Sequence, residues 1–266
     1  MLNTSLNTLK ASDISFKIKD KYLVKDVNLD FSEGKLTVIM GQNGAGKSTL
    51  LKILANSLKS TTGNVKFKDT DIKDFTDLQL AKIRAVLSQH YDITFPITVD
   101  DIVIMGRYPH FKNTPRSEDN RICDEVMRML DVDYLKEREY GTLSGGEAQK
   151  VQMARVLSQI WEKDTSKILF LDEPVSNLDM KYQHQILSIA QKISRENCIV
   201  IAVLHDINLA INYADRIIFM RNGFVKYILD DLKDLSEEII EDIFNVKAKI
   251  IINPYSNKPL VVYGES

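Results

Sequence analysis

The chain has 266 residues, of which 44% are hydrophobic and 27% charged, and 35 Lys and Arg stand against 37 Asp and Glu. This length allows one large α/β domain or two small ones, and the balanced charge excludes the basic surface typical of proteins that bind nucleic acid. Cys123 and Cys198 have no CxxC partner, which predicts two buried thiols in a reducing cytosol.

Hydrophobic runs are too short for a membrane span. The longest, over residues 198–204, has seven residues, whereas a spanning helix needs about 20. Residues 1–13 are polar and lack the apolar stretch of a secretory signal. We therefore expect this chain to meet a membrane only through a partner.

The first third of the chain reads as short strands around one helix. Apolar or alternating runs predict strands over residues 14–18, 27–31, 36–40, 65–67 and 85–88. Leucines at positions 50, 51, 54 and 58 predict a helix over residues 47–58. The run over 36–40 lies between glycines, as in a buried strand.

Residues 98–141 turn helical, through 99–105 and 119–130, which suggests a helical subdomain inserted into an α/β core. Strands are then predicted over 168–171, 199–204 and 216–220, and helices near 180–194 and 206–213. Such alternation predicts a mainly parallel sheet covered on both faces. The tail reads as a helix over 237–244 and strands near 248–252 and 260–262.

A glycine-rich loop is the most specific local signal. It follows the strand over 36–40 and matches GxxxxGK[ST] as Gly41, Gln42, Asn43, Gly44, Ala45, Gly46, Lys47 and Ser48. Its glycines let the backbone wrap round a phosphate, and the helix that follows adds partial positive charge. Lys47 supplies a cation for the β- and γ-phosphates and Ser48 a hydroxyl for Mg²⁺. A plain glycine turn would not need this Lys-Ser pair.

Two adjacent carboxylates, Asp172 and Glu173, end the apolar strand near 168–171. Ligands of open α/β sheets bind at this carboxyl edge. Asp172 suits a hydrated Mg²⁺, and Glu173 suits the general base that orients an attacking water. An isolated acidic strand end would be unremarkable, but here it follows a phosphate loop.

A second helix start contains Ser144, Gly145, Gly146 and Glu147, after Leu143. By itself this could be a simple helix N-cap with a flexible turn. Together with the phosphate loop it predicts a second anion site, which is explained if each helix start binds a different nucleotide.

These three motifs in this order resemble the ABC ATPase family, across roughly residues 12–230, with the phosphate loop extended to Thr49. The resemblance implies a P-loop NTPase fold: a mainly parallel α/β core, an N-terminal antiparallel β subdomain and an inserted helical subdomain. The division expected within one domain over 1–266 is core at about 1–97 and 164–230, helical subdomain at about 98–163 and C-terminal extension at 231–266. It also implies a head-to-tail, ATP-dependent homodimer. Glu147 stands where the family usually has Gln.

Further roles follow only from this resemblance. Gln89 is similar to the glutamine that touches Mg²⁺ and the attacking water and senses the membrane partner. Asp179, in Ser-Asn-Leu-Asp, is similar to the D-loop at the dimer seam, and His205 to the switch histidine on the γ-phosphate. The implied catalytic set is Glu173, His205, Gln89 and Lys47; the implied Mg²⁺ ligands are Ser48, Gln89 and Asp172. His90 and His184 are interpreted as surface or packing histidines.

The family often stacks adenine on an aromatic side chain about 23 residues before the phosphate loop, and Ile18 occupies that position. Phe16 or Tyr22 could serve instead, or the base could rest on aliphatic surface.

Residues 102–110 are similar to a segment of ATPases from iron-siderophore, haem and cobalamin importers. Three features most resemble the haem group: Met-Gly-Arg-Tyr-Pro-His at 105–110, Gln-Ile-Trp at 159–161 and Tyr-Gln-His at 182–184. The resemblance implies haem (hemin) import through a separate permease, with ferric siderophore or cobalamin as the alternative cargo. Residues 89–110 are expected to receive a coupling helix of the permease, and Arg107 and His110 alone read as a solvated turn.

The resemblance implies a peripheral subunit at the cytoplasmic face of the inner membrane. A substrate-binding protein would be its partner only indirectly, through the permease. A soluble ABC protein acting on DNA or ribosomes would predict two cassettes, a long coiled coil or a basic face. A P-loop kinase would leave unexplained both the family signature, residues 143–147, and His205.

Overall fold

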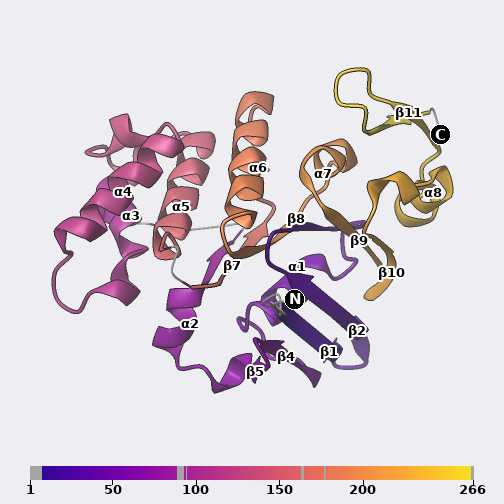
Figure 1. Cartoon of the computed structure of the whole chain (residues 1–266), viewed down its shortest axis with the longest axis horizontal. Coiled ribbons are helices and arrows are strands. Elements are labelled where there is room, and N and C mark those ends of the chain that lie inside the picture. Colours follow the sequence, from indigo (N-terminus) through magenta and orange to yellow (C-terminus); the bar gives the residue numbers. More distant parts are fainter. Residues whose placement is uncertain (1–7, 89–92, 94, 163–164, 177, 265–266) are drawn as a thin grey trace, which may run out of the picture.

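The computed structural model describes residues 8–88, 93, 95–162, 165–176 and 178–264. Figure 1 shows three regions around a central sheet: an N-terminal antiparallel sheet below it, a block of helices at the left, and a C-terminal helix and hairpin at the right. This arrangement is the α/β fold that the motifs imply.

Six strands form the central sheet in the order β10-β9-β3-β8-β7-β6. The strands are β3 (Leu36–Met40), β6 (Arg84–Leu87), β7 (Lys167–Asp172), β8 (Cys198–Val203), β9 (Arg216–Arg221) and β10 (Phe224–Leu229). All neighbours are parallel except β9 and β10. Every residue of β3, β7 and β8 is buried, which explains their unbroken apolar runs and confirms the mainly parallel sheet.

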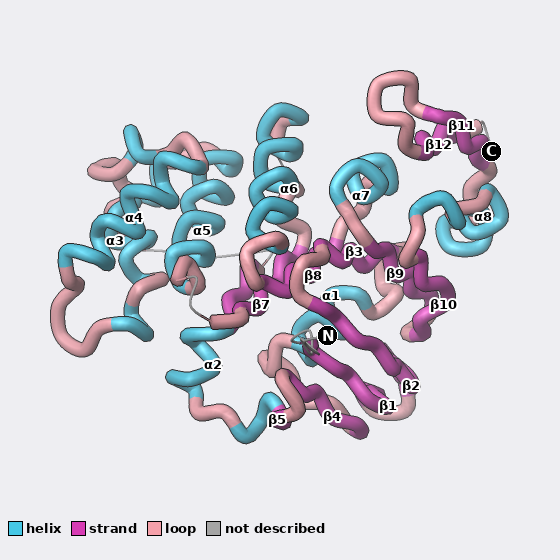
Figure 2. The backbone as a smooth tube through the Cα atoms, viewed as in Figure 1, coloured by secondary structure: helices cyan, strands magenta, loops and turns pink. Residues whose placement is uncertain are grey.

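Two hydrophobic cores lie on the two faces of this sheet. One joins Ile39 to helix α1 (Lys47–Leu54) and to the N-terminal sheet, and the other joins Val38 to the helices that cover the opposite face. The covering helices include α6 (Met180–Ser194) and α7 (Ile207–Tyr213). Figure 2 shows the strands running between these layers.

The N-terminal sheet has the order β2-β1-β4-β5. Its strands are β1 (Thr8–Ile18), β2 (Lys21–Ser32), β4 (Thr62–Phe67) and β5 (Thr70–Asp71). The predicted strands over 14–18 and 27–31 were wrong in length. Register shifts near Asp13, which has a φ of 52°, interrupt the alternation of buried and exposed residues. The sequence pattern therefore reveals only part of each strand.

Several further bounds and elements differ from expectation, among them the start of β4 at Thr62 and that of helix α4 (Ser117–Met129). Helix α1 ends at Leu54 and not at Leu58, because Asn56 takes a left-handed conformation with φ 53° that stops the helix. Strand β10 and helix α2 (Asp77–Ile83) were not predicted. Helix α6 and the helix and first strand of the tail have the expected bounds.

The helical block contains α3 (Val99–Met105), α4 (Ser117–Met129) and α5 (Gly145–Gln159). Helices α3 and α5 approach so closely that a Cβ on Gly106 would lie 2.1 Å from the Arg155 carbonyl oxygen. The limits of this subdomain, like the rest of the domain division, stay a prediction.

Arg107 and His110 were wrongly expected in a solvated turn. Their side chains are only 1% and 4% exposed. Arg107 donates hydrogen bonds to Asp119 Oδ1 (3.0 Å), to the Ser158 carbonyl (2.8 Å) and to Glu162 Oε1 (2.7 Å). The two side chains therefore join α3, α4 and α5 from inside.

The C-terminal extension consists of α8 (Glu237–Phe244) and the hairpin β11 (Ala248–Ile252) and β12 (Pro259–Tyr263). The Asn208 side chain on α7 donates to the Val261 carbonyl (3.0 Å) and accepts from its N–H (2.9 Å). Lys258 Nζ donates to the carbonyls of Ile211 (3.2 Å) and Asn212 (2.6 Å) at the end of α7. The hairpin is thus bonded to α7.

Both cysteine thiols are buried, as predicted. Burial raises the pKa of the Cys123 thiol to about 12, and it also raises the pKa of the Cys198 thiol. Among the helices of the described ranges, none is long and apolar enough to cross a bilayer.

Candidate functional site

The phosphate loop lies at the carboxyl end of β3, pressed against neighbouring strands. A Cβ on Gly41 would lie 2.1 Å from the Met220 carbonyl oxygen, and one on Gly46 would lie 2.2 Å from the Leu23 carbonyl oxygen. Gly41, Gly44 and Gly46 have φ values of 147°, 78° and 99°, which favour glycine. The backbone can therefore wrap round an anion at this point.

Lys47 lies within this loop. Its Nζ donates to the carbonyls of Gly41 and Gln42, each at 2.9 Å. Burial lowers the pKa of the Lys47 ammonium, and the carboxylates of Glu173 and Asp172 act against that change. The Lys47 ammonium therefore lies at the N-terminus of α1, where a phosphate group could replace the two carbonyls as its hydrogen-bond partner.

Ser48 and Asp172 come together although they are far apart in sequence. The Ser48 hydroxyl donates to Asp172 Oδ1 at 2.8 Å. Burial raises the pKa of Asp172, and the Ser48 hydrogen bond opposes the rise. One hydroxyl and one carboxylate suit Mg²⁺, which takes few protein oxygens and completes its shell with water and phosphate. The described residues contain no denser His, Cys, Asp or Glu cluster that could hold a metal.

Glu173 and His205 form the second pair at this edge. His205 Nε2 lies 2.6 Å from Glu173 Oε1. Glu173 has the unusual φ of 53°, and its carbonyl accepts hydrogen bonds from the Ser176 hydroxyl (3.0 Å) and from Gln149 Nε2 (3.3 Å). These contacts hold a backbone conformation that a non-glycine residue adopts at a cost. Glu173 and His205 both line a hollow of about 180 Å³, and Gln183 lines it as well.

The signature serine caps helix α5. Glu147 N–H donates to Ser144 Oγ at 3.3 Å, and Glu147 Oε2 accepts from both the N–H and the hydroxyl of Ser144, each at 2.8 Å. This is a complete capping box. These two hydrogen bonds lower the pKa of Glu147, the backbone one more strongly. The carboxylate is therefore ionised at neutral pH.

A hollow of about 380 Å³ lies beside Ser144, and Asp179 lines it as well. The signature and the D-loop aspartate therefore share one surface. Of the described residues that line this hollow, none belongs to the phosphate loop.

Several predicted positions lie outside the described residues: Gln89, His90 and Asn177. For adenine, Ile18 is exposed at the turn between β1 and β2, and Phe16 packs against the N-terminal core. Tyr22 keeps an exposed ring, with the Lys25 ammonium 5.3 Å from its centroid. His184 lies as interpreted, at the surface, with Nδ1 2.7 Å from the Tyr213 hydroxyl.

Sequence reasoning missed two glutamines of α5. Gln149 donates to the carbonyls of Glu173 and Pro174, and Gln159 donates to those of Ala81 (2.7 Å) and Arg84 (2.9 Å). Polar side chains on a mostly buried helix were the available signal, because such groups need partners. Both connect the helical block to the core.

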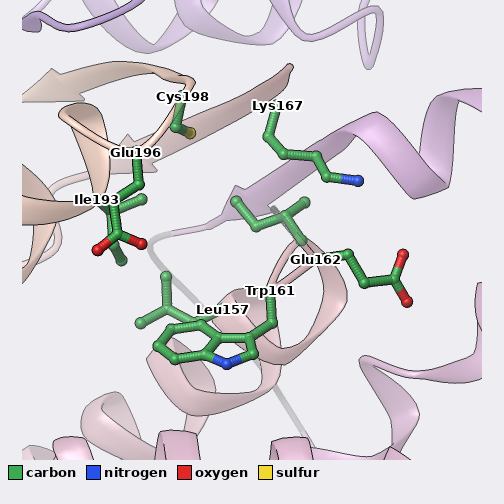
Figure 3. A pocket seen from close by; sticks show the side chains of 8 residues that line it. Leu157, Trp161, Glu162, Lys167, Ile193, Glu196 and Cys198 are labelled. Atoms are coloured by element: carbon green, nitrogen blue, oxygen red, sulfur yellow. The ribbon is translucent and has the colours of Figure 1, made fainter. Parts of the chain in front are cut away.

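A small hollow of about 30 Å³ lies at the far end of α5. Figure 3 shows Leu157 and Trp161 on one side of it and Cys198 and Lys167 on the other. Cys198 and Lys167 begin β8 and β7, so this hollow lies at the amino edge of the sheet and apart from the nucleotide site.

Comparisons with known proteins agree with this geometry. Residues 24–176 match the family model described as ABC transporter. The chain is 40% identical to the Hemin import ATP-binding protein HmuV of Gloeobacter violaceus, over 96% of this chain and 93% of the relative. Its identity to the protein of the same name from Escherichia coli O157:H7 is 34%, over 96% and 98%.

Two solved structures have the same fold. A metal-chelate type ABC transporter in an inward-facing conformation superposes with a TM-score of 0.81 at 24% identity, covering 97% of this chain and 98% of that one. A dimeric bacterial ABC transporter cassette superposes with a TM-score of 0.71 at 26% identity, covering 83% and 97%.

Proposed function

Because the chain belongs to the ABC transporter family, we propose that it is the ATP-hydrolysing subunit of an importer that moves haem through a separate permease. We infer haem as the cargo from near full-length similarity to proteins named for hemin import, at 34% to 40% identity. ATP hydrolysis belongs to the family, and the site supplies residues for each step.

Binding of ATP begins at the phosphate loop. The backbone N–H groups of residues 41–49 surround the β- and γ-phosphates, and Lys47 exchanges its bonds to Gly41 and Gln42 for phosphate oxygens. Ser48 and Asp172, with Gln89, would hold Mg²⁺. When bound, this ion neutralises the charge that develops on the phosphate oxygens.

The hydrolytic step uses the Glu173–His205 pair. The Glu173 carboxylate orients a water and accepts its proton as the water oxygen bonds to the γ-phosphorus. The bond from that phosphorus to the β–γ bridging oxygen breaks, and ADP and phosphate leave. His205, which lies 2.6 Å from Glu173, contacts the γ-phosphate and fixes the carboxylate. Lys47 stabilises the charge on the transferred group.

Two copies close head to tail in this proposal. Ser144, Gly145 and Gly146 of one copy meet the γ-phosphate held by the other, and Asp179 lies at the same seam. Support comes from the shared surface of Ser144 and Asp179 and from the dimeric cassette with the same fold. Each nucleotide site would then need residues from both copies.

The permease would dock beside the helical block. A hollow of about 340 Å³ there is lined by apolar side chains that include Leu78 and Phe111 and by the basic side chains of Lys82, Lys112 and Arg116. An amphipathic coupling helix with an acidic end suits this surface. Such docking would place the chain at the cytoplasmic face of the membrane, with the substrate-binding protein reached only through the permease.

Tyr22 is the aromatic side chain best placed for adenine. Its ring is exposed and its neighbour Leu23 contacts Gly46 of the phosphate loop, whereas Phe16 is packed in the core. We propose that the base stacks on Tyr22 in place of the usual aromatic at position 18.

The test is ATP hydrolysis by the chain assembled with its permease in liposomes. We expect haem presented by the substrate-binding protein to stimulate hydrolysis, and ferric siderophore or cobalamin to leave it at the basal rate. Glu173→Gln should lower turnover by about 10² to 10⁴-fold. Wild-type turnover by this variant would overturn the base assignment, and stimulation by cobalamin or a siderophore alone would overturn the cargo.

A further inference from the structure

We propose that Glu147 opposes closure of the two copies: its carboxylate holds the Ser144 hydroxyl proton and repels the incoming γ-phosphate, and a closer approach to its ion-pair partner Arg138 relieves both effects. This inference rests on the proposed function, because it concerns the signature of the same ATP-driven dimer. It assigns Glu147 a positioning role that goes beyond capping the helix.

The first observation is that the signature hydroxyl is already committed. Ser144 has one hydroxyl proton, and it is donated to Glu147 Oε2 at 2.8 Å. A phosphate oxygen can accept only from a hydroxyl that turns its proton outward. Contact with the γ-phosphate therefore requires that the bond to Glu147 break first.

The second observation is the charge that stays behind. Glu147 is held at Ser144 by a further bond from the Ser144 N–H, also at 2.8 Å, and its pKa is lowered by these bonds. Its side chain is 22% exposed, so water screens it only in part. A γ-phosphate that bonds to Ser144 Oγ would meet this negative charge at short range, and like charges repel.

Arg138 is placed to receive the carboxylate. Its NH1 forms an ion pair with Glu147 Oε1 at 3.6 Å, a separation longer than a hydrogen bond. Arg138 itself is anchored, because its Nε donates to Thr142 Oγ1 (3.1 Å) and its NH2 to the Thr142 carbonyl (2.8 Å). Glu147 Oε1 faces Arg138 while Oε2 holds Ser144. A rotation that brings Oε1 to this fixed guanidinium and draws Oε2 away from Ser144 would complete a charge-assisted bond and free the hydroxyl.

A glutamine at this position would act differently. Its amide oxygen could still accept the Ser144 N–H, so the capping box would remain. It would carry no charge against the phosphate. Glu147→Gln therefore separates the charge from the cap, and a merely structural role predicts no change in dimer affinity.

The experiment measures ATP-driven dimerisation of the full chain by sedimentation, with Mg²⁺ and with Glu173→Gln as the parent to stop hydrolysis. Adding Glu147→Gln should lower the dimer Kd about tenfold or more, which corresponds to about 1.4 kcal/mol. Glu241→Gln is the matched control: it removes the same charge from an exposed position on α8. It should leave the Kd within about twofold of the parent.

Arg138→Gln tests the second half of the inference as a double-mutant cycle. It should weaken the dimer in the parent by about fivefold or more and have a much smaller effect in the Glu147→Gln background. Equal weakening in both backgrounds would show that Arg138 contacts the nucleotide by itself and would overturn its role as receiver.

The outcomes separate this inference from the function on which it rests. A parent that dimerises with ATP, and an unchanged Kd on adding Glu147→Gln, would overturn the role of Glu147 and leave the sandwich intact. A parent that stays monomeric with ATP at every concentration would overturn both. Urea unfolding of each variant serves as the control for an unchanged fold.

Discussion

The two ends of helix α5 differ in how their polar groups are used. At its start, Ser144 and Glu147 bond mainly to each other beside a hollow of about 380 Å³. At its end, the Ser158 carbonyl accepts from Arg107, and the Gln159 side chain donates to two carbonyls of the core. The end proposed to meet a second copy bonds within its own motif, and the end that holds the fold bonds to other elements.

This difference predicts that substitutions at the end of α5 reduce stability most, and that those at its start reduce activity with little loss of stability.

Arg107→Met should have the largest effect, a loss of about 3–5 kcal/mol in the free energy of unfolding, because it leaves the buried Asp119 without the guanidinium that donates to its Oδ1. Burial of Asp119 acts to raise its pKa, but hydrogen bonds from the Arg116 N–H and from Arg107 outweigh it and keep that pKa low. Urea unfolding measures the loss. Arg121→Met is the control, since Arg121 is 60% exposed on α4 and its ion pairs contribute about 1 kcal/mol or less. Similar losses for both would contradict the prediction.

Gln159→Leu should cost about 1–3 kcal/mol, because the carbonyls of Ala81 and Arg84 lose a donor. It should also weaken permease-stimulated hydrolysis more than basal hydrolysis, since α2 borders the proposed docking hollow. Gln191→Leu removes one comparable bond, to the Tyr213 carbonyl at 2.7 Å, and serves as the control. An equal fall of basal and stimulated rates with Gln159→Leu would argue against a link through this residue.

Ser144→Ala should have the smallest effect on stability, about 1 kcal/mol for a lost N-cap, but it should lower ATP turnover about 10²-fold through loss of a donor to the γ-phosphate. Ser236→Ala removes an equivalent cap from α8, where Ser236 Oγ accepts from Ile239 N–H at 3.4 Å. This control should lose similar stability and keep its turnover. The comparison fails if both variants hydrolyse ATP alike.

The sequence predicted local features well and long-range packing poorly. The phosphate loop and the strand ending in Asp172 were found because glycine spacing and unbroken apolar runs depend on neighbours in the chain. The contact of Ser48 with Asp172 agrees with the shared metal role proposed for them.

Two of the misses come from the influence of distant residues, and a third comes from a local irregularity in a strand. Arg107 was expected in solvent because nothing nearby in sequence marks Asp119 and Glu162 as its partners. Strand β1 was predicted too short because bulges break its alternation. Gln159 carried no recognisable motif, and its role depends on carbonyls more than 70 positions away.

The C-terminal hairpin has a consequence for His205, the histidine proposed to contact the γ-phosphate. Helix α7 has seven residues, fewer than the roughly 12–15 that an isolated helix needs to be even marginally stable in water. Asn208 and Lys258 tie both ends of this helix to the hairpin, and α7 begins two residues after His205. Strands β11 and β12 thus stabilise α7 and the turn before it, which presents the His205 imidazole. These strands lie beyond the residues 24–176 that match the family model.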